Sequence, residues 1–147
     1  MSELPGAVLF ACTYNAIRSP MAEGMLKYLL GRRIYVQSCG MRVGDLDAFA
    51  VLVMDEIGID ISKHRPRSFE ELEDACFDLV ISLSPEAQHH AVELTRHNAT
   101  ELEFWNMPDP SLETGARDQI LASYRLLRDR LMQRIVERFR TEALPRV

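Results

Sequence analysis

Four short apolar runs alternate with longer segments in which apolar and polar residues mix. The runs span residues 7–12, 34–39, 77–83 and 101–105. Each has the length of a strand. Runs of this kind are typical of parallel sheets, whose strands are covered on both faces. The chain is therefore predicted to contain a parallel sheet of four strands.

Between and after these runs, apolar residues recur at the spacing of three and four that marks a helix. The pattern predicts helices over residues 19–31, 47–57, 85–96 and 115–139. Gly31 is a suitable C-cap for the first helix. The last helix carries an apolar stripe expected to pack into the core: Ile120, Tyr124, Leu127, Leu131, Ile135 and Phe139. Strands that alternate with helices predict one three-layer α/β domain over residues 1–147, with helices on both faces of the sheet.

Composition excludes several classes of function. The formal net charge is −5 and the pI is near 5.4, which argues against a protein that binds nucleic acid or anionic membranes. No apolar run approaches 18 residues, and the first six residues lack the basic and apolar regions of a signal peptide. We expect a cytoplasmic monomer or weak dimer.

The three cysteines and four histidines show no metal-ligand spacing, so neither a metal site nor a cofactor is expected. Cys39 and Cys76 each stand beside a predicted strand, and we expect both to be small buried core residues. The remaining cysteine, Cys12, lies at the end of the first strand and needs a different explanation.

The most informative motif follows that strand, as Cys12-Thr13-Tyr14-Asn15-Ala16-Ile17-Arg18-Ser19. A loop between a strand and a helix N-terminus offers unpaired N–H groups and a positive dipole, which together bind anions. A cysteine in such a place favours its thiolate form. Arg18 can hold two oxygens of a tetrahedral anion with its planar guanidinium. The motif therefore predicts nucleophilic chemistry at phosphorus or a similar centre.

Residues 8–23 resemble the signature of low-molecular-weight protein tyrosine phosphatases, and also that of the thioredoxin-coupled arsenate reductases that share their fold. Residues 104–110, Phe-Trp-Asn-Met-Pro-Asp-Pro, are similar to the Asp-Pro segment that carries the family's general acid. Residues 38–40 and 59–65 match as well, so the resemblance covers nearly the whole chain. It implies a four-stranded sheet in the order two-one-three-four.

The resemblance also implies roles for individual residues. Cys12 would attack phosphorus and form a phosphocysteine. The N–H groups of Thr13, Tyr14, Asn15, Ala16, Ile17 and Arg18, with the Arg18 guanidinium, would bind the phosphate oxygens. Asp109 would be the general acid, although Asp between two prolines also suits a simple turn. Ser19 would donate to the sulfur, or cap the helix, or do both. Ser38 and His64 would support Asn15, unless His64 is an ordinary surface histidine.

The chain departs from both groups of relatives. Ile17 replaces the second loop cysteine of the phosphatases, Ser111 stands where they often have a tyrosine, and residues 41–44 contain no aromatic residue. These departures weaken the case for an aromatic substrate. In the region after the third strand, where reductases carry two further cysteines, this chain has Ser82, Ser84 and Ala91.

We interpret the chain as a metal-independent phosphomonoester hydrolase with a cysteine nucleophile. Its substrate would be a phosphorylated protein, chiefly on tyrosine, or a small phosphomonoester. The alternatives are an arsenate reductase that uses an external thiol donor, and an oxyanion-binding module that has lost turnover.

Overall fold

The protein is described by a computed structural model that covers residues 4–72 and 76–139. The expected domain of residues 1–147 therefore includes stretches that lie outside the described residues. The strands are β1 (Ala7–Cys12), β2 (Tyr35–Gly40), β3 (Leu79–Ser82) and β4 (Glu101–Phe104). They pair in parallel in the order β2-β1-β3-β4, which confirms the order implied by the resemblance.

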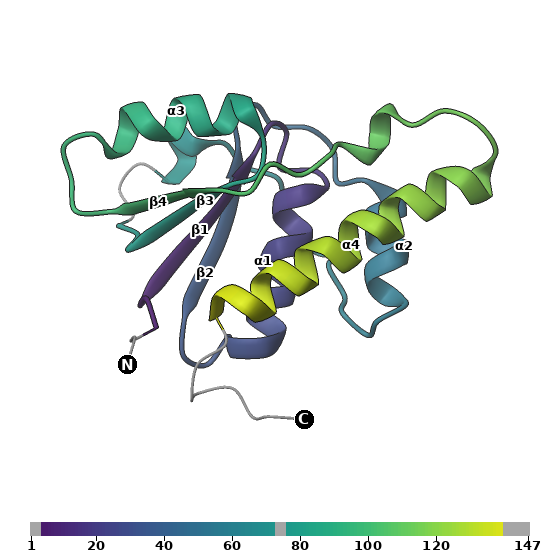
Figure 1. Cartoon of the computed structure of the whole chain (residues 1–147), viewed down its shortest axis with the longest axis horizontal. Coiled ribbons are helices and arrows are strands. Elements are labelled where there is room, and N and C mark those ends of the chain that lie inside the picture. The colour runs from purple at the N-terminus through teal and green to yellow at the C-terminus, as the bar shows by residue number, and fades with distance from the viewer. Residues whose placement is uncertain (1–3, 73–75, 140–147) are drawn as a thin grey trace.

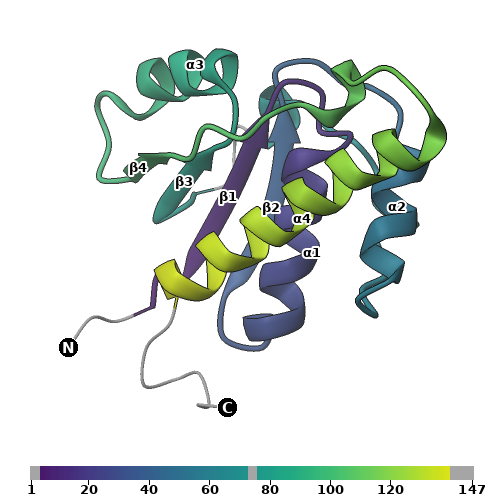
Figure 2. The ribbon, with the colours of Figure 1, turned by 45° about the vertical axis from the view of Figure 1, so that its right-hand side comes forward.

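All four predicted helices are present, with small shifts at their ends: α1 (Arg18–Leu30), α2 (Ala48–Asp55), α3 (Pro85–Thr95) and α4 (Arg117–Phe139). Helices α1 and α4 cover one face of the sheet, α2 lies beside α4, and α3 covers the other face (Figures 1 and 2). The predicted three-layer architecture is confirmed. Two 3₁₀ turns, η1 (Phe69–Leu72) and η2 (Pro110–Leu112), were not predicted, because a single turn is too short to show a helical period.

Side-chain alternation along β1 divides the core into two clusters. Val8 and Phe10 face α1 and α4, whereas Leu9 and Ala11 face α3 and η1. The residues of α4 that face the first cluster are buried as predicted, except that Leu121 is buried where Ile120 was expected and Ile120 packs at its edge. No helix within the described ranges is both long and apolar enough to span a membrane.

One core prediction is wrong. Cys76 was expected to be buried next to the third strand, but it is exposed. The reason is that β3 begins at Leu79 instead of residue 77, so Cys76 lies before the sheet, in the connection that follows η1.

The carboxyl ends of β1, β3 and β4 bring three distant segments together. The N–H of Leu83 donates to the carbonyl of Ala11 at 2.7 Å, and the N–H of Met107 donates to the carbonyl of Leu83 at 3.1 Å. The chain after β4 is thereby held against the end of β1. This is the edge of a parallel sheet at which ligands usually bind.

Candidate active site

The loop after β1, residues 13–17, turns its N–H groups inward. Backbone N–H groups of the segment 41–47 donate to the carbonyls of Cys12, Thr13, Tyr14 and Ala16, at distances of 2.9–3.1 Å. The C=O and N–H of a peptide unit point in opposite directions, so a loop bound through its carbonyls exposes its N–H groups on the other side. None of the N–H groups of residues 13–17 donates to a protein acceptor among the described residues. Together they form a concave anion site.

A glycine permits this close packing. At Gly40, at the end of β2, a Cβ atom would lie 2.6 Å from the backbone nitrogen of Asn15. Any other residue would push the loop outward, because real Cβ atoms do not approach backbone atoms so closely.

Cys12 lies at the base of the loop, and its sulfur faces Ser19. The distance from Cys12 Sγ to Ser19 Oγ is 2.8 Å, within hydrogen-bond reach. Helix α1 begins at Arg18, and its N-cap, Ile17, provides no side-chain cap. The alternative in which Ser19 caps the helix is therefore wrong. The hydroxyl instead faces the sulfur.

Asn15 occupies the centre of the loop and is fully buried. Its φ is 55°, and no other described non-glycine residue has a positive φ. Asparagine is among the residues that best tolerate this conformation. Its amide nitrogen donates to Ser19 Oγ and Ser38 Oγ at 2.8 and 2.9 Å. Its amide oxygen accepts from the N–H of Arg67 and from His64 Nε2, both at 2.9 Å.

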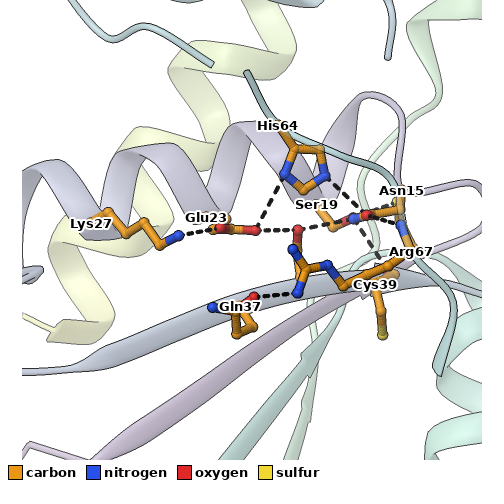
Figure 3. Close-up of polar contacts among 10 residues, drawn as sticks. Asn15, Ser19, Glu23, Lys27, Gln37, Cys39, His64 and Arg67 are labelled. Atoms are coloured by element: carbon orange, nitrogen blue, oxygen red, sulfur yellow. Dashed lines mark hydrogen bonds and ion pairs between the residues drawn. The ribbon is translucent and has the colours of Figure 1, made fainter. Parts of the chain in front are cut away.

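Beyond Asn15, the same hydrogen-bond network ends in a buried carboxylate that the sequence analysis did not assign (Figure 3). Glu23 accepts hydrogen bonds from Ser38 Oγ and Lys27 Nζ. Since the hydroxyl of Ser38 has one hydrogen and gives it to Glu23, its lone pairs remain to accept from Asn15. Glu23 lies four residues after Ser19, on the same face of α1, and that spacing was the available signal.

This network also limits the direction of the Ser19 hydroxyl to two acceptors. Ser19 accepts from Asn15, so its own hydrogen can go only to the sulfur of Cys12 or to the carbonyl of Cys39, at 3.3 Å. Burial lowers the pKa of His64, and the carboxylate of Glu23, 3.7 Å from Nδ1, opposes that effect only in part. A neutral His64 that donates through Nε2 agrees with its contact to Asn15.

The side chain of Arg18 is held in place by two hydrogen bonds. Its Nη1 donates to the carbonyl of Met107 at 3.2 Å and its Nη2 donates to Thr13 Oγ1 at 3.4 Å, while its side chain is only 9% exposed. A charged side chain buried this deeply needs polar partners. The Met107 carbonyl that supplies one could not be identified from the sequence, because it depends on the path of the chain after β4.

Asp109 reaches the same place from the segment after β4. Its Oδ1 accepts from the N–H and the hydroxyl of Ser111, at 2.9 and 2.6 Å. Its Oδ2 lies 3.9 Å from Arg18 Nη2. Cys12, Arg18 and Asp109 line one pocket of about 190 Å³.

An aromatic residue at this pocket was missed by the sequence analysis. Tyr14, within the loop itself, lines the pocket and is 46% exposed. Residues 41–44 contain no aromatic residue but do contain Arg42, whose guanidinium lies 5.4 Å from the centre of the Tyr14 ring.

The other cysteines do not face this pocket. Cys39 is buried as predicted, but it belongs to the core cluster under α3, whereas Cys12 belongs to the cluster under α1 and α4. Burial is the main cause that raises the pKa of the Cys39 thiol. Within residues 4–72 and 76–139, no group of three or more His, Cys, Asp or Glu side chains could hold a metal ion.

Comparison with known proteins agrees with the fold. An arsenate reductase of Bacillus subtilis is 33% identical over 132 residues, which are 88% of this chain and 92% of the relative. The structure of a low-molecular-weight protein tyrosine phosphatase from T. tengcongensis is 28% identical, with a TM-score of 0.71 over 91% of this chain and 99% of the other. A tyrosine phosphatase of Erwinia amylovora, at 19% identity, shares the fold, with a TM-score of 0.75 over 97% of this chain and 95% of the other.

The family model described as low molecular weight phosphotyrosine protein phosphatase matches residues 7–142. That range includes the anion loop, Asp109 and every described strand and helix. The chain belongs to the low-molecular-weight phosphotyrosine protein phosphatase family.

Proposed function

We propose that the protein hydrolyses phosphomonoesters, with protein phosphotyrosine as its main substrate, through a phosphocysteine intermediate. The observation that carries the proposal is the position of Cys12 Sγ, 2.8 Å from Ser19 Oγ, in the same pocket as Arg18 and Asp109. Tyr14 offers an aromatic surface in the same pocket, which a phenyl ring can stack against.

The proposed reaction has two steps. The sulfur of Cys12 forms a bond to phosphorus while the bond to the ester oxygen breaks, and Asp109 gives that oxygen its proton. Water then attacks phosphocysteine after giving a proton to Asp109, and the thiolate leaves with phosphate as the product. The inward N–H groups of the loop and the guanidinium of Arg18 stabilise the charge on the equatorial oxygens.

The hydroxyl of Ser19 has a role in both steps. Its hydrogen bond to the sulfur stabilises the thiolate as nucleophile and as leaving group. Asn15, Ser38 and Glu23 act through Ser19 and are therefore positioning residues.

Reduction of arsenate is a second candidate, because several curated relatives near 33% identity are named arsenate reductases. Ser84, after β3, does reach the loop, since its Oγ accepts from Thr13 Oγ1 at 3.1 Å. However, it is a serine where a thiol relay would need a cysteine. Reduction by this chain would therefore require an external thiol donor.

The test compares hydrolysis of p-nitrophenyl phosphate, with and without EDTA, against arsenate reduction with glutathione or thioredoxin as donor. We expect hydrolysis that EDTA does not change. Cys12→Ser should abolish turnover yet still bind vanadate, because the anion site is made by the backbone and Arg18. Arsenate reduction without phosphate ester hydrolysis would overturn the proposal in favour of the reductase.

A further inference from the structure

The rim of the catalytic pocket carries an unusual set of charges. Three carboxylates line the pocket together with Cys12: Asp45, Asp47 and Asp109. Arg18 is the only cationic side chain among the described residues that line it. It faces the loop, where it is expected to bind the phosphoryl group. Asp109 is the proton donor of the proposed reaction, so the negative charge of the part of the pocket that meets the rest of the substrate comes from Asp45 and Asp47.

A second arginine stands near the rim, but its charge is already paired. Arg42, over the ring of Tyr14, makes two hydrogen bonds of 2.9 Å to the two carboxylate oxygens of Glu86. A bidentate pair of this kind is the strongest geometry for arginine and carboxylate. The pair is neutral overall, so Arg42 and Glu86 together add little net positive charge near the rim.

Two of the three carboxylates are fixed in position. Asp47 caps α2, where it accepts from the N–H groups of Phe49 and Ala50, and it also accepts from the hydroxyl of Tyr124 at 2.9 Å. Burial, the bond to Asp47 and the charges of Asp47 and Asp109 together raise the pKa of Tyr124. Both carboxylates line the same pocket.

Asp45 differs from the other two. It is exposed at the rim, and it makes no hydrogen bond or ion pair with any other described residue. Its charge is available to a ligand. A carboxylate repels an acidic group that approaches the pocket and attracts a basic one.

We propose that the preferred substrate is a phosphopeptide with an arginine or lysine next to the phosphorylated residue, and that Asp45 reads that charge. This inference rests on the proposed hydrolysis. The anion loop binds the phosphoryl group, and the acidic rim then selects among phosphopeptides by the charge beside it.

The test uses three phosphotyrosine peptides of equal length, in which the residues flanking phosphotyrosine are arginine, serine or glutamate. We expect kcat/KM to fall in that order, with the arginine peptide about tenfold above the glutamate peptide at low salt. Raising the salt concentration should shrink the difference, because exposed charges are screened.

Asp45→Asn should reduce the ratio of the arginine peptide to the glutamate peptide by about threefold, mainly through KM. The matched control is Asp55→Asn, which removes an exposed carboxylate of α2 that does not line the pocket. This control should keep the wild-type ratio. A wild-type enzyme that hydrolyses all three peptides equally, or an Asp45→Asn variant with an unchanged ratio, would overturn this inference and leave the proposed function intact. Absence of any hydrolysis would overturn both.

Discussion

Replacement of Asn15 by alanine is the most direct test of the network beneath the sulfur. The change removes the partner of two partly buried donors, the N–H of Arg67 and Nε2 of His64, and takes a donor from Ser19 and Ser38. Each stranded donor costs about 1–3 kcal/mol. Alanine at a φ of 55° adds about 1 kcal/mol. The free energy of unfolding should fall by about 3–7 kcal/mol.

Asn15→Gly separates the two contributions. Glycine accepts a positive φ without strain but also lacks the amide. Asn15→Gly should therefore be more stable than Asn15→Ala by about 1 kcal/mol and still far less stable than wild type. Asn106→Ala, at an exposed position, serves as the control and should change stability by less than about 0.5 kcal/mol.

Urea unfolding followed by tryptophan fluorescence is a suitable assay, because the single tryptophan, Trp105, is buried in the core. The turnover number of Asn15→Ala, measured without urea, should also be lower than that of the wild type, because Ser19 loses the contact with Asn15 that orients it. If Asn15→Ala lies within 1 kcal/mol of wild type, the network does not stabilise the loop. Equal stability of the alanine and glycine variants would refute the argument from φ.

Three further predictions follow from the site. Asp109→Asn should slow hydrolysis of alkyl phosphates far more than that of p-nitrophenyl phosphate, because a good leaving group needs little protonation. If the rate of the variant depends on the pKa of the leaving group as the wild-type rate does, Asp109 is not the acid. Peroxide should inactivate the enzyme by oxidising Cys12, without forming an intramolecular disulfide, because Cys39 points to the other side of the sheet. Mass spectrometry of the treated protein checks this, and a Cys12–Cys39 crosslink in high yield would contradict it. Stability should fall as the pH drops below 6.5, the ordinary pKa of histidine, because the unfolded chain then binds a proton that buried His64 resists. Urea unfolding at several pH values would show this loss, which should be smaller in His64→Gln.

The sequence by itself determined the parts of this protein that depend on neighbours in the chain. Apolar runs and helical periods located every strand and every full helix, because burial of a strand or of a helix face requires those patterns locally. The spacing from Cys12 to Arg18 indicated the anion loop for the same reason, since a strand, a tight loop and a helix N-terminus are all encoded within one segment.

Only the tertiary structure decided which distant groups complete the site. Glu23, the carbonyl of Met107, the aromatic wall at Tyr14 and the free carboxylate of Asp45 depend on how segments pack at the end of the sheet. Cys12 and Cys39 point in opposite directions because of side-chain alternation and strand register. Cys76 is exposed because β3 begins only at Leu79. Contacts between distant segments are set by packing of the whole chain, and no local pattern records them.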